Sequence, residues 1–212
     1  MTVEPVLELW DFTGENPEVP AEADVQTALR KVNGTGIHLN GQTLTFDSAD
    51  IRLDLGALVK GYAADRLKEY LTAKGASAAV INLGGNVYAL GNNNGNPWKV
   101  GIQKPFSLRG ETLTVVETEN RSVVSSGTYE RYFEKDGRQY HHIIDARTGY
   151  PAVSDLSQVT IVSDSSLEGD LLSTVCFLLG SERGIAYVQS RDDVQAIFVG
   201  GQSAILYTDF GN

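Results

Sequence analysis

The chain of 212 residues has few of the residues that form covalent cross-links or multi-ligand metal clusters. It contains one cysteine, Cys176, and three histidines. A single cysteine excludes an internal disulfide and a metal site with several cysteine ligands. Cys176 lies in the apolar run of residues 174–179, so we expect an unreactive thiol in the core.

Long apolar runs and an excess of basic residues are also absent. No run reaches the ~18 residues of a membrane-spanning helix, so no membrane span is expected. The net charge of -10, from 17 basic and 27 acidic residues, argues against nucleic acid as a partner. Residues 1–15 are acidic and mixed, unlike a signal peptide, so the chain could be cytoplasmic or lack its natural start.

The residues that are present predict one α+β domain over residues 1–212. The 42% hydrophobic content is enough for a single sizeable core. Strands are expected at residues 37–39, 43–46, 78–82, 87–90, 98–102, 112–117, 122–125, 131–134, 139–144, 157–162, 195–199 and 204–207, and helices at 23–32, 57–74, 166–179 and 182–189. Runs of strands with a few inserted helices favour helices packed on a mostly antiparallel sheet.

Lys60 is the most informative residue of the expected helix 57–74. Helical spacing places it on one face with four apolar residues: Ala63, Ala64, Leu67 and Leu71. A lysine on such a face should be buried, and a buried charge needs a partner. Because it also lies near a helix N-terminus, which favours anions, Lys60 could bind a phosphate.

Asp170 and Thr174 lie one turn apart on the expected helix 166–179, beside an apolar stripe formed by Leu167, Leu171, Val175 and Leu178. Ser165 and Glu168 form a plausible capping box at its start. A carboxylate and a hydroxyl on one face are oxygen ligands suited to Mg²⁺ or Ca²⁺. The pattern alone fits an aspartate favoured by the helix dipole at least as well.

Two further segments have both a structural and a functional interpretation. His141 and His142 alternate along an expected strand, so one of them should face inward, as a general acid/base or as a hydrogen-bonded core residue. Residues 83–86 (Leu-Gly-Gly-Asn) and 125–128 (Ser-Ser-Gly-Thr) could approach a phosphate, or form an ordinary turn and a polar loop. No P-loop, dinucleotide fingerprint or serine-hydrolase elbow is present.

The order of these segments resembles the ApbE family of FAD:protein FMN transferases. The resemblance rests on residues 54–65 (DLGALVKGYAAD), 80–86 (VINLGGN), 124–127 (VSSG), 142–149 (HIIDARTG), the Asp170–Thr174 helix and residues 7–12 (LELWDF). It covers essentially the whole chain and implies an ApbE-like (T-fold-like) architecture. Ala146 stands where the family usually has proline.

This resemblance implies a Mg²⁺-dependent transferase that moves FMN from FAD onto a Thr or Ser hydroxyl of an acceptor protein and releases AMP. Asp170, Thr174 and the carbonyl of Ala57 would hold Mg²⁺. Asp54, Lys60, Ile144 and Ser173 would contact FAD. Lys60 and Asp170 would also serve catalysis, together with His142 as a base toward the acceptor hydroxyl.

The resemblance also implies an acceptor protein, which would carry a motif like Asp-Gly-x-Ser/Thr-Gly-Ala-Thr. Alternatives are an FAD pyrophosphatase that yields FMN and AMP, and a non-catalytic flavin-binding protein. The last is considered because the family's N-terminal portion is missing here, together with the lipoprotein signal of its extracytoplasmic members.

Overall fold

The computed structural model describes residues 2–208, and the chain divides into two compact units. Unit 1 comprises residues 1–55 and 130–152, and unit 2 comprises residues 56–129 and 153–212. All strand pairings among the described residues are antiparallel, which agrees with the predicted α+β class. The prediction of a single domain over residues 1–212 stays a prediction.

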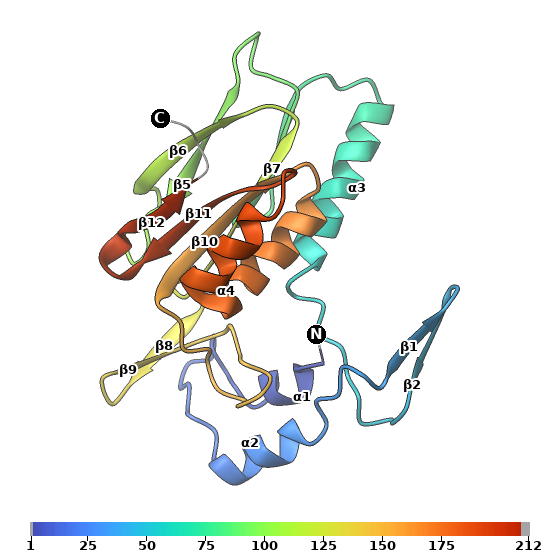
Figure 1. Cartoon of the computed structure of the whole chain (residues 1–212), viewed down its shortest axis with the longest axis vertical. Coiled ribbons are helices and arrows are strands. Elements are labelled where there is room, and N and C mark those ends of the chain that lie inside the picture. The colour runs from blue at the N-terminus through green and yellow to red at the C-terminus, as the bar shows by residue number, and fades with distance from the viewer. Residues whose placement is uncertain (1, 209–212) are drawn as a thin grey trace. The chain divides into compact units, whose positions relative to one another are not determined.

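Unit 2 is built on a six-stranded antiparallel sheet (Figure 1). Its strands follow the spatial order β12-β11-β10-β7-β4-β3. They are β3 (Ala79–Asn82), β4 (Asn86–Leu90), β7 (Arg121–Gly127), β10 (Leu156–Ser163), β11 (Gln195–Gly200) and β12 (Ile205–Thr208), with a short 3-10 helix, η1 (Gly201–Ser203), before β12. Every residue of β10 is buried, as expected for a strand in the middle of a covered sheet.

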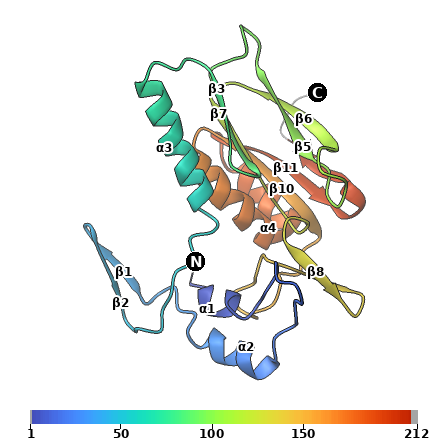
Figure 2. The same cartoon turned by 180° about the vertical axis from the view of Figure 1, so that it is seen from behind.

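Different elements cover the two faces of this sheet (Figure 2). The helices α3 (Val59–Ala73) and α4 (Ser166–Gln189) lie on one face, and the hairpin of β5 (Trp98–Gln103) and β6 (Thr112–Thr118) packs on the other. Adjacent residues of β7 reflect this arrangement. Val123 joins the core cluster that contains Ile102 and Val116 of the hairpin, whereas Val124 lies against Gly169 of α4.

The helix α4 consists of two helical segments that meet at Gly180, where φ is 77°. This agrees with the predicted end of one helix at residue 179 and the start of another at 182. By length and composition, α4 is the one helix within residues 2–208 that could cross a membrane. Because Gly180 interrupts it and it packs on β7 and β10, we interpret it as a core helix.

The prediction that an apolar stripe forms the buried face of α4 is wrong. Leu167, Leu171 and Leu178 are 36%, 36% and 44% exposed. The buried face instead combines small or polar residues with larger apolar ones: Ser166, Gly169, Asp170, Leu172, Ser173, Cys176 and Phe177. The first turns of α4 lie so close to the sheet that a Cβ on Gly169 would be 2.9 Å from Val124 Cγ2, which leaves no room for leucine there. Cys176 is buried as predicted, and burial raises the pKa of its thiol to about 11.

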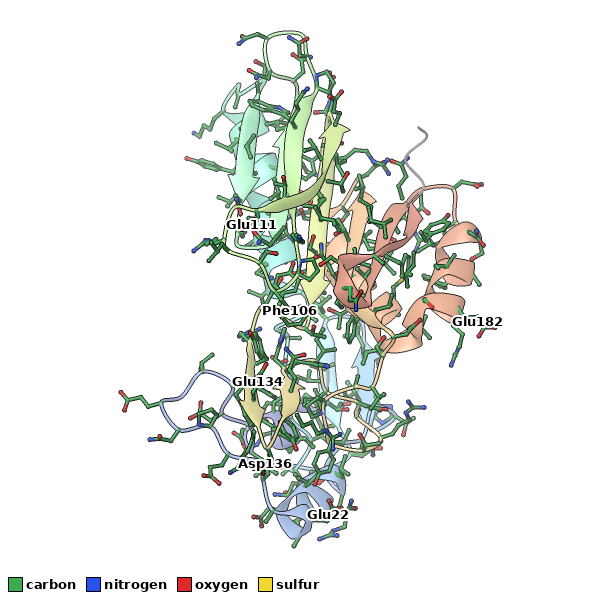
Figure 3. The ribbon with its side chains drawn as sticks, turned by 90° about the vertical axis from the view of Figure 1, so that its left-hand side faces the viewer. Glu22, Phe106, Glu111, Glu134, Asp136 and Glu182 are labelled. Atoms are coloured by element: carbon green, nitrogen blue, oxygen red, sulfur yellow. The ribbon has the colours of Figure 1, made fainter. Side chains whose placement is uncertain are left out.

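Unit 1 contains two short helices and two hairpins around an aromatic core. The helices are α1 (Glu4–Leu7) and α2 (Glu22–Leu29), and the hairpins are β1–β2 (Ile37–Asn40, Thr43–Phe46) and β8–β9 (Tyr132–Lys135, Arg138–His141). Trp10 is 4% exposed and packs with Phe133 and Tyr140, and its Nε1 donates to the carbonyl of Gly149 at 3.0 Å. Figure 3 labels Glu134 and Asp136 on the β8–β9 hairpin.

Several unit 1 elements differ from the prediction, and α2 ends at Leu29 rather than at residue 32. The expected strand 139–144 ends at His141, and only a single bridge from Ile144 to Pro151 follows it. The chain bends at His142, and Ile143 and Ile144 are both buried, a pattern that a regular strand with one covered face does not produce. The helix α1 was not predicted. At four residues it is too short to leave a periodic pattern.

Candidate functional site

The Asp170 side chain lies at the N-terminus of the neighbouring helix. Its Oδ2 accepts a hydrogen bond of 2.9 Å from the backbone N–H of Gly61, in the first turn of α3. Asp170 is 3% exposed, which confirms that it points inward. Burial raises the pKa of this carboxyl, although the Gly61 N–H and the charge of Lys60 act in the opposite direction. Within residues 2–208, its other oxygen, Oδ1, accepts no hydrogen bond, and it is not one of the fully buried side-chain atoms that lack a partner.

Three hydroxyl groups gather one turn further along α4. The Ser173 and Thr174 hydroxyls donate to the backbone carbonyl of Asp170, at 3.0 and 3.4 Å. Ser126 of β7 bridges them, with its Oγ 2.8 Å from Ser173 Oγ and 3.3 Å from Thr174 Oγ1. Ser173 is fully buried and Thr174 is half-buried. Ser125, Ser126 and Gly127 are the last residues of the strand β7, so the interpretation of this segment as a polar loop is wrong.

Lys60 is the second residue of α3, and the prediction that it is buried is wrong. The helix buries Gly61, Ala64 and Asp65, whereas Lys60 is only half-buried and Leu67 is 42% exposed. The backbone of α4 approaches α3 at Gly61, and this contact rotates the buried face away from Lys60. The Lys60 Nζ donates to the carbonyl of Gly84 at 3.2 Å, and its positive charge also acts on the carboxyl of Asp170.

The glycine pair next to Lys60 forms the tight turn between β3 and β4. Gly84 and Gly85 have φ values of 63° and 82°, which side chains rarely adopt. Asn82 Oδ1 accepts from the Gly84 N–H at 3.1 Å and holds the turn. Ala57, the predicted carbonyl ligand, is half-buried in the turn that precedes α3.

Asp65 is a buried carboxylate that the sequence did not single out. Its two oxygens accept hydrogen bonds from the Ser166 N–H (2.9 Å), the Leu167 N–H (3.0 Å) and the Ser165 hydroxyl (2.7 Å), at the start of α4. Burial acts to raise the pKa of Asp65, but these donors and Lys68 outweigh it and the pKa is lowered. Sequence offered little signal for this role, because an aspartate three residues before a lysine is typical of a surface ion pair.

The predicted capping box at the start of α4 is half formed. Ser165 Oγ accepts from the Glu168 N–H at 3.3 Å. The Glu168 carboxylate does not return to the backbone of Ser165 and instead pairs with Arg191 at 2.6 Å. At the first turn of α4, the N–H groups of Ser166 and Leu167 donate instead to Asp65, which comes from α3 and not from α4 itself.

Asp54, His142 and Ile144 lie in unit 1. His141 is the inward-facing histidine, at 7% exposed, and burial lowers its pKa. His142 is half-buried, with Nδ1 3.2 Å from the carbonyl of Arg131. The segment that follows is a turn, as predicted, because the Thr148 and Gly149 N–H groups both donate to the carbonyl of Asp145.

Comparison with known proteins decides the family. The sequence model of the ApbE family matches residues 1–198. The chain belongs to the ApbE family. It is 40% identical over 201 residues to an FAD:protein FMN transferase of Klebsiella pneumoniae (strain 342), covering 94% of this chain and 62% of that protein. It is 36% identical over 209 residues to the transferase of Treponema pallidum (strain Nichols), covering 91% of this chain and 58% of that protein.

Solved ApbE structures share the fold. The crystal structure of the ApbE protein of Thermotoga maritima matches with a TM-score of 0.86 and 31% identity, over 98% of this chain and 69% of that one. The apo flavinyl transferase ApbE of Pseudomonas stutzeri matches with a TM-score of 0.81 and 31% identity, over 98% and 65%. The predicted ApbE-like architecture is confirmed. The chain spans about 60% of the length of the curated ApbE relatives named above.

Proposed function

We propose that this chain carries the catalytic part of a Mg²⁺-dependent FAD:protein FMN transferase. Two curated relatives bear that name at 36–40% identity. The observation that carries the proposal is the buried Asp170 carboxylate with one oxygen bound by Gly61 and the other accepting no hydrogen bond within the described residues. Burial disfavours the charged form of this carboxylate, and the Lys60 charge offsets that only in part, since the pKa stays raised. A bound cation would stabilise the charged form further.

The residues present fit a magnesium ion. Asp170, Thr174 and the Ala57 carbonyl offer only oxygen ligands, the kind that Mg²⁺ prefers. Residues 2–208 contain no group of three or more His, Cys, Asp or Glu that could hold a metal. A sparse set of protein ligands suits Mg²⁺, which keeps several waters and is shared with substrate phosphates. When bound, the ion would stabilise negative charge on the pyrophosphate.

In the proposed reaction, the acceptor hydroxyl oxygen attacks the phosphorus on the FMN side of the FAD pyrophosphate. A P–O bond forms to the acceptor, the P–O bond to AMP breaks, and His142 accepts the proton of the hydroxyl. Lys60 would neutralise charge that grows on the pyrophosphate as that bond breaks. Asp54, Ile144 and Ser173 would bind and orient FAD.

An incubation of the chain with FAD, Mg²⁺ and an acceptor peptide tests the proposal. The peptide carries the pattern Asp-Gly-x-Ser/Thr-Gly-Ala-Thr. A metal-dependent mass gain of one FMN on the peptide is the expected result. The matched control peptide carries alanine at the acceptor Ser/Thr position. Release of FMN and AMP without labelled peptide would instead identify a pyrophosphatase. Flavin binding with no metal-dependent product would identify a binding protein and contradict both enzymatic functions.

A further inference from the structure

The first turn of each of the helices α3 and α4 is capped by a buried carboxylate from the second turn of the other. Asp170 of α4 accepts the Gly61 N–H of α3, and Asp65 of α3 accepts the Ser166 and Leu167 N–H groups of α4. Gly61 and Asp65 are four residues apart in α3, and Ser166 and Asp170 are four residues apart in α4. Gly61 pairs with Asp170 and Asp65 pairs with Ser166, so the pairs run in opposite chain order. The helices are therefore antiparallel here and joined at two points one helical turn apart.

The two helices have little room to shift against each other between these two hydrogen-bonded points. A Cβ on Gly61 would lie 2.3 Å from the Ser166 carbonyl oxygen and 2.6 Å from Leu167 Cα, so the two backbones are already in contact. A shift or rotation of the α4 start would move Asp170, one turn further along the same helix. Asp65 is the charged side chain from α3 that holds that start in place.

We propose that Asp65 is a positioning residue for the cation site, acting through α4 on the Asp170 carboxylate. It does not contact the cation itself. It fixes the register of α4 against α3, so that Asp170 keeps one oxygen on Gly61 and presents the other. This inference rests on the proposed function, because Asp170 defines the cation site.

The chain offers a matched control for a purely structural capping role. Asp155 also caps a helical segment of α4: its Oδ1 accepts the Ser181 N–H at 3.0 Å and its Oδ2 accepts the Ser181 hydroxyl. This cap follows Gly180, about three helical turns beyond Asp170. Asp65→Asn and Asp155→Asn thus each remove a carboxylate that caps a segment of α4 from outside the helix, one near the site and one away from it.

The experiment measures Mn²⁺ affinity of the whole chain by electron paramagnetic resonance, without substrate, alongside thermal unfolding. Asp65→Asn should weaken Mn²⁺ binding by about 10- to 100-fold, the usual loss when a residue that orients a metal ligand is changed. Asp155→Asn should bind Mn²⁺ as the wild type does, although both variants lower the unfolding temperature.

Three results would overturn the inference or its basis, and they can be told apart. Unchanged Mn²⁺ affinity in a folded Asp65→Asn variant means that Asp65 has only a structural role. Equal weakening in Asp155→Asn means that any loss of a cap disturbs the site. Absence of Mn²⁺ binding in the wild type, both alone and with added inorganic pyrophosphate, refutes the proposed cation site itself.

A milder variant decides the question if Asp65→Asn does not fold. Ser165→Ala removes the 2.7 Å bond to Asp65 and the N-cap acceptor of the Glu168 N–H, but it leaves both backbone donors to Asp65 in place. It should weaken Mn²⁺ binding measurably, and an affinity equal to that of the wild type would overturn the positioning role.

Discussion

The N-termini of α3 and α4 are built from the same parts but differ in how far their donors are satisfied. At α4, Asp65 and Ser165 together accept from Ser166, Leu167 and Glu168. At α3, the N-cap residue Leu58 offers no side-chain acceptor, and Asp170 accepts from Gly61 alone. A helix start keeps several backbone N–H groups without helical partners, and side chains accept from more of them at α4 than at α3.

The two buried carboxylates differ in the same way. The pKa of Asp65 is lowered because several donors outweigh burial, whereas the pKa of Asp170 is raised because burial dominates. A carboxylate that is satisfied by the protein stabilises the fold, and one that is left short of donors invites a cation. Under the proposed function, this difference would separate a structural end of the helix pair from the end that holds the cation.

Removal of the Asp170 carboxylate should have the largest effect. Asp170→Ala is expected to lower FMN transfer by about 10³-fold and abolish its Mg²⁺ dependence, because several kcal/mol of charge stabilisation are lost. The fold should persist, since little is gained from a carboxylate that burial disfavours. Initial rates over a Mg²⁺ series, with circular dichroism as the folding control, check this. Unchanged activity would refute the assigned site, and an unfolded variant would favour a structural capping role for Asp170.

Removal of the Lys60 charge should have the next largest effect. Lys60→Met is expected to reduce kcat/KM for FAD by roughly 10- to 100-fold, because a positive charge beside the pyrophosphate is lost. Lys60→Arg keeps the charge and should retain most of the activity. Steady-state kinetics with varied FAD separates kcat from KM. Equal rates for Lys60→Met and the wild type would contradict the role of Lys60.

A methyl group at the contact between the two helices should destabilise the protein. Gly61→Ala is expected to lower the free energy of unfolding by about 1–3 kcal/mol, since the new Cβ meets the backbone of Ser166 and Leu167. Alanine is the better helix former, so this loss is opposite to the intrinsic preference. Gly34→Ala, where a Cβ would meet nothing within 4 Å, is the control in urea unfolding. A stabilised Gly61→Ala variant would show that the two helices are not in close contact.

Acid should weaken the closed end of the pair by the smallest amount. The folded pKa of Asp65 lies below that of the unfolded chain, so its contribution to stability is present above about pH 4 and is lost as the pH falls further. Urea unfolding between pH 7 and pH 3 should show a shallower decline for Asp65→Asn than for the wild type. Identical slopes would mean that the Asp65 hydrogen bonds do not stabilise the folded state.

Local patterns predicted much of the fold. The glycine after Asn40 in the β1–β2 hairpin, Gly75 with φ of 86° after α3 and the break at Gly180 are single-residue signals that act within their own segment. The apolar run at Cys176 also depends on few neighbours. Such features are read correctly because the local backbone determines them.

The rest depended on tertiary contacts that the sequence does not encode locally. Leucines were expected to mark the buried face of α4, but Gly169 and Ser173 lie there, because the helix approaches the sheet too closely for larger side chains. Lys60 was expected to be buried because helical spacing places it on one face with apolar residues, but it is only half-buried. The role of Asp65 stayed hidden because its partners are about a hundred residues away in the chain.

The assignment of a cation to the α3 end of the pair can be tested most directly by crystallography. A crystal of the chain soaked with Mn²⁺ should give an anomalous peak beside Asp170 and Thr174, near the carbonyl of Ala57, and none at Asp65. A peak at Asp65, or no peak at Asp170 when the site is saturated with Mn²⁺, would contradict the account.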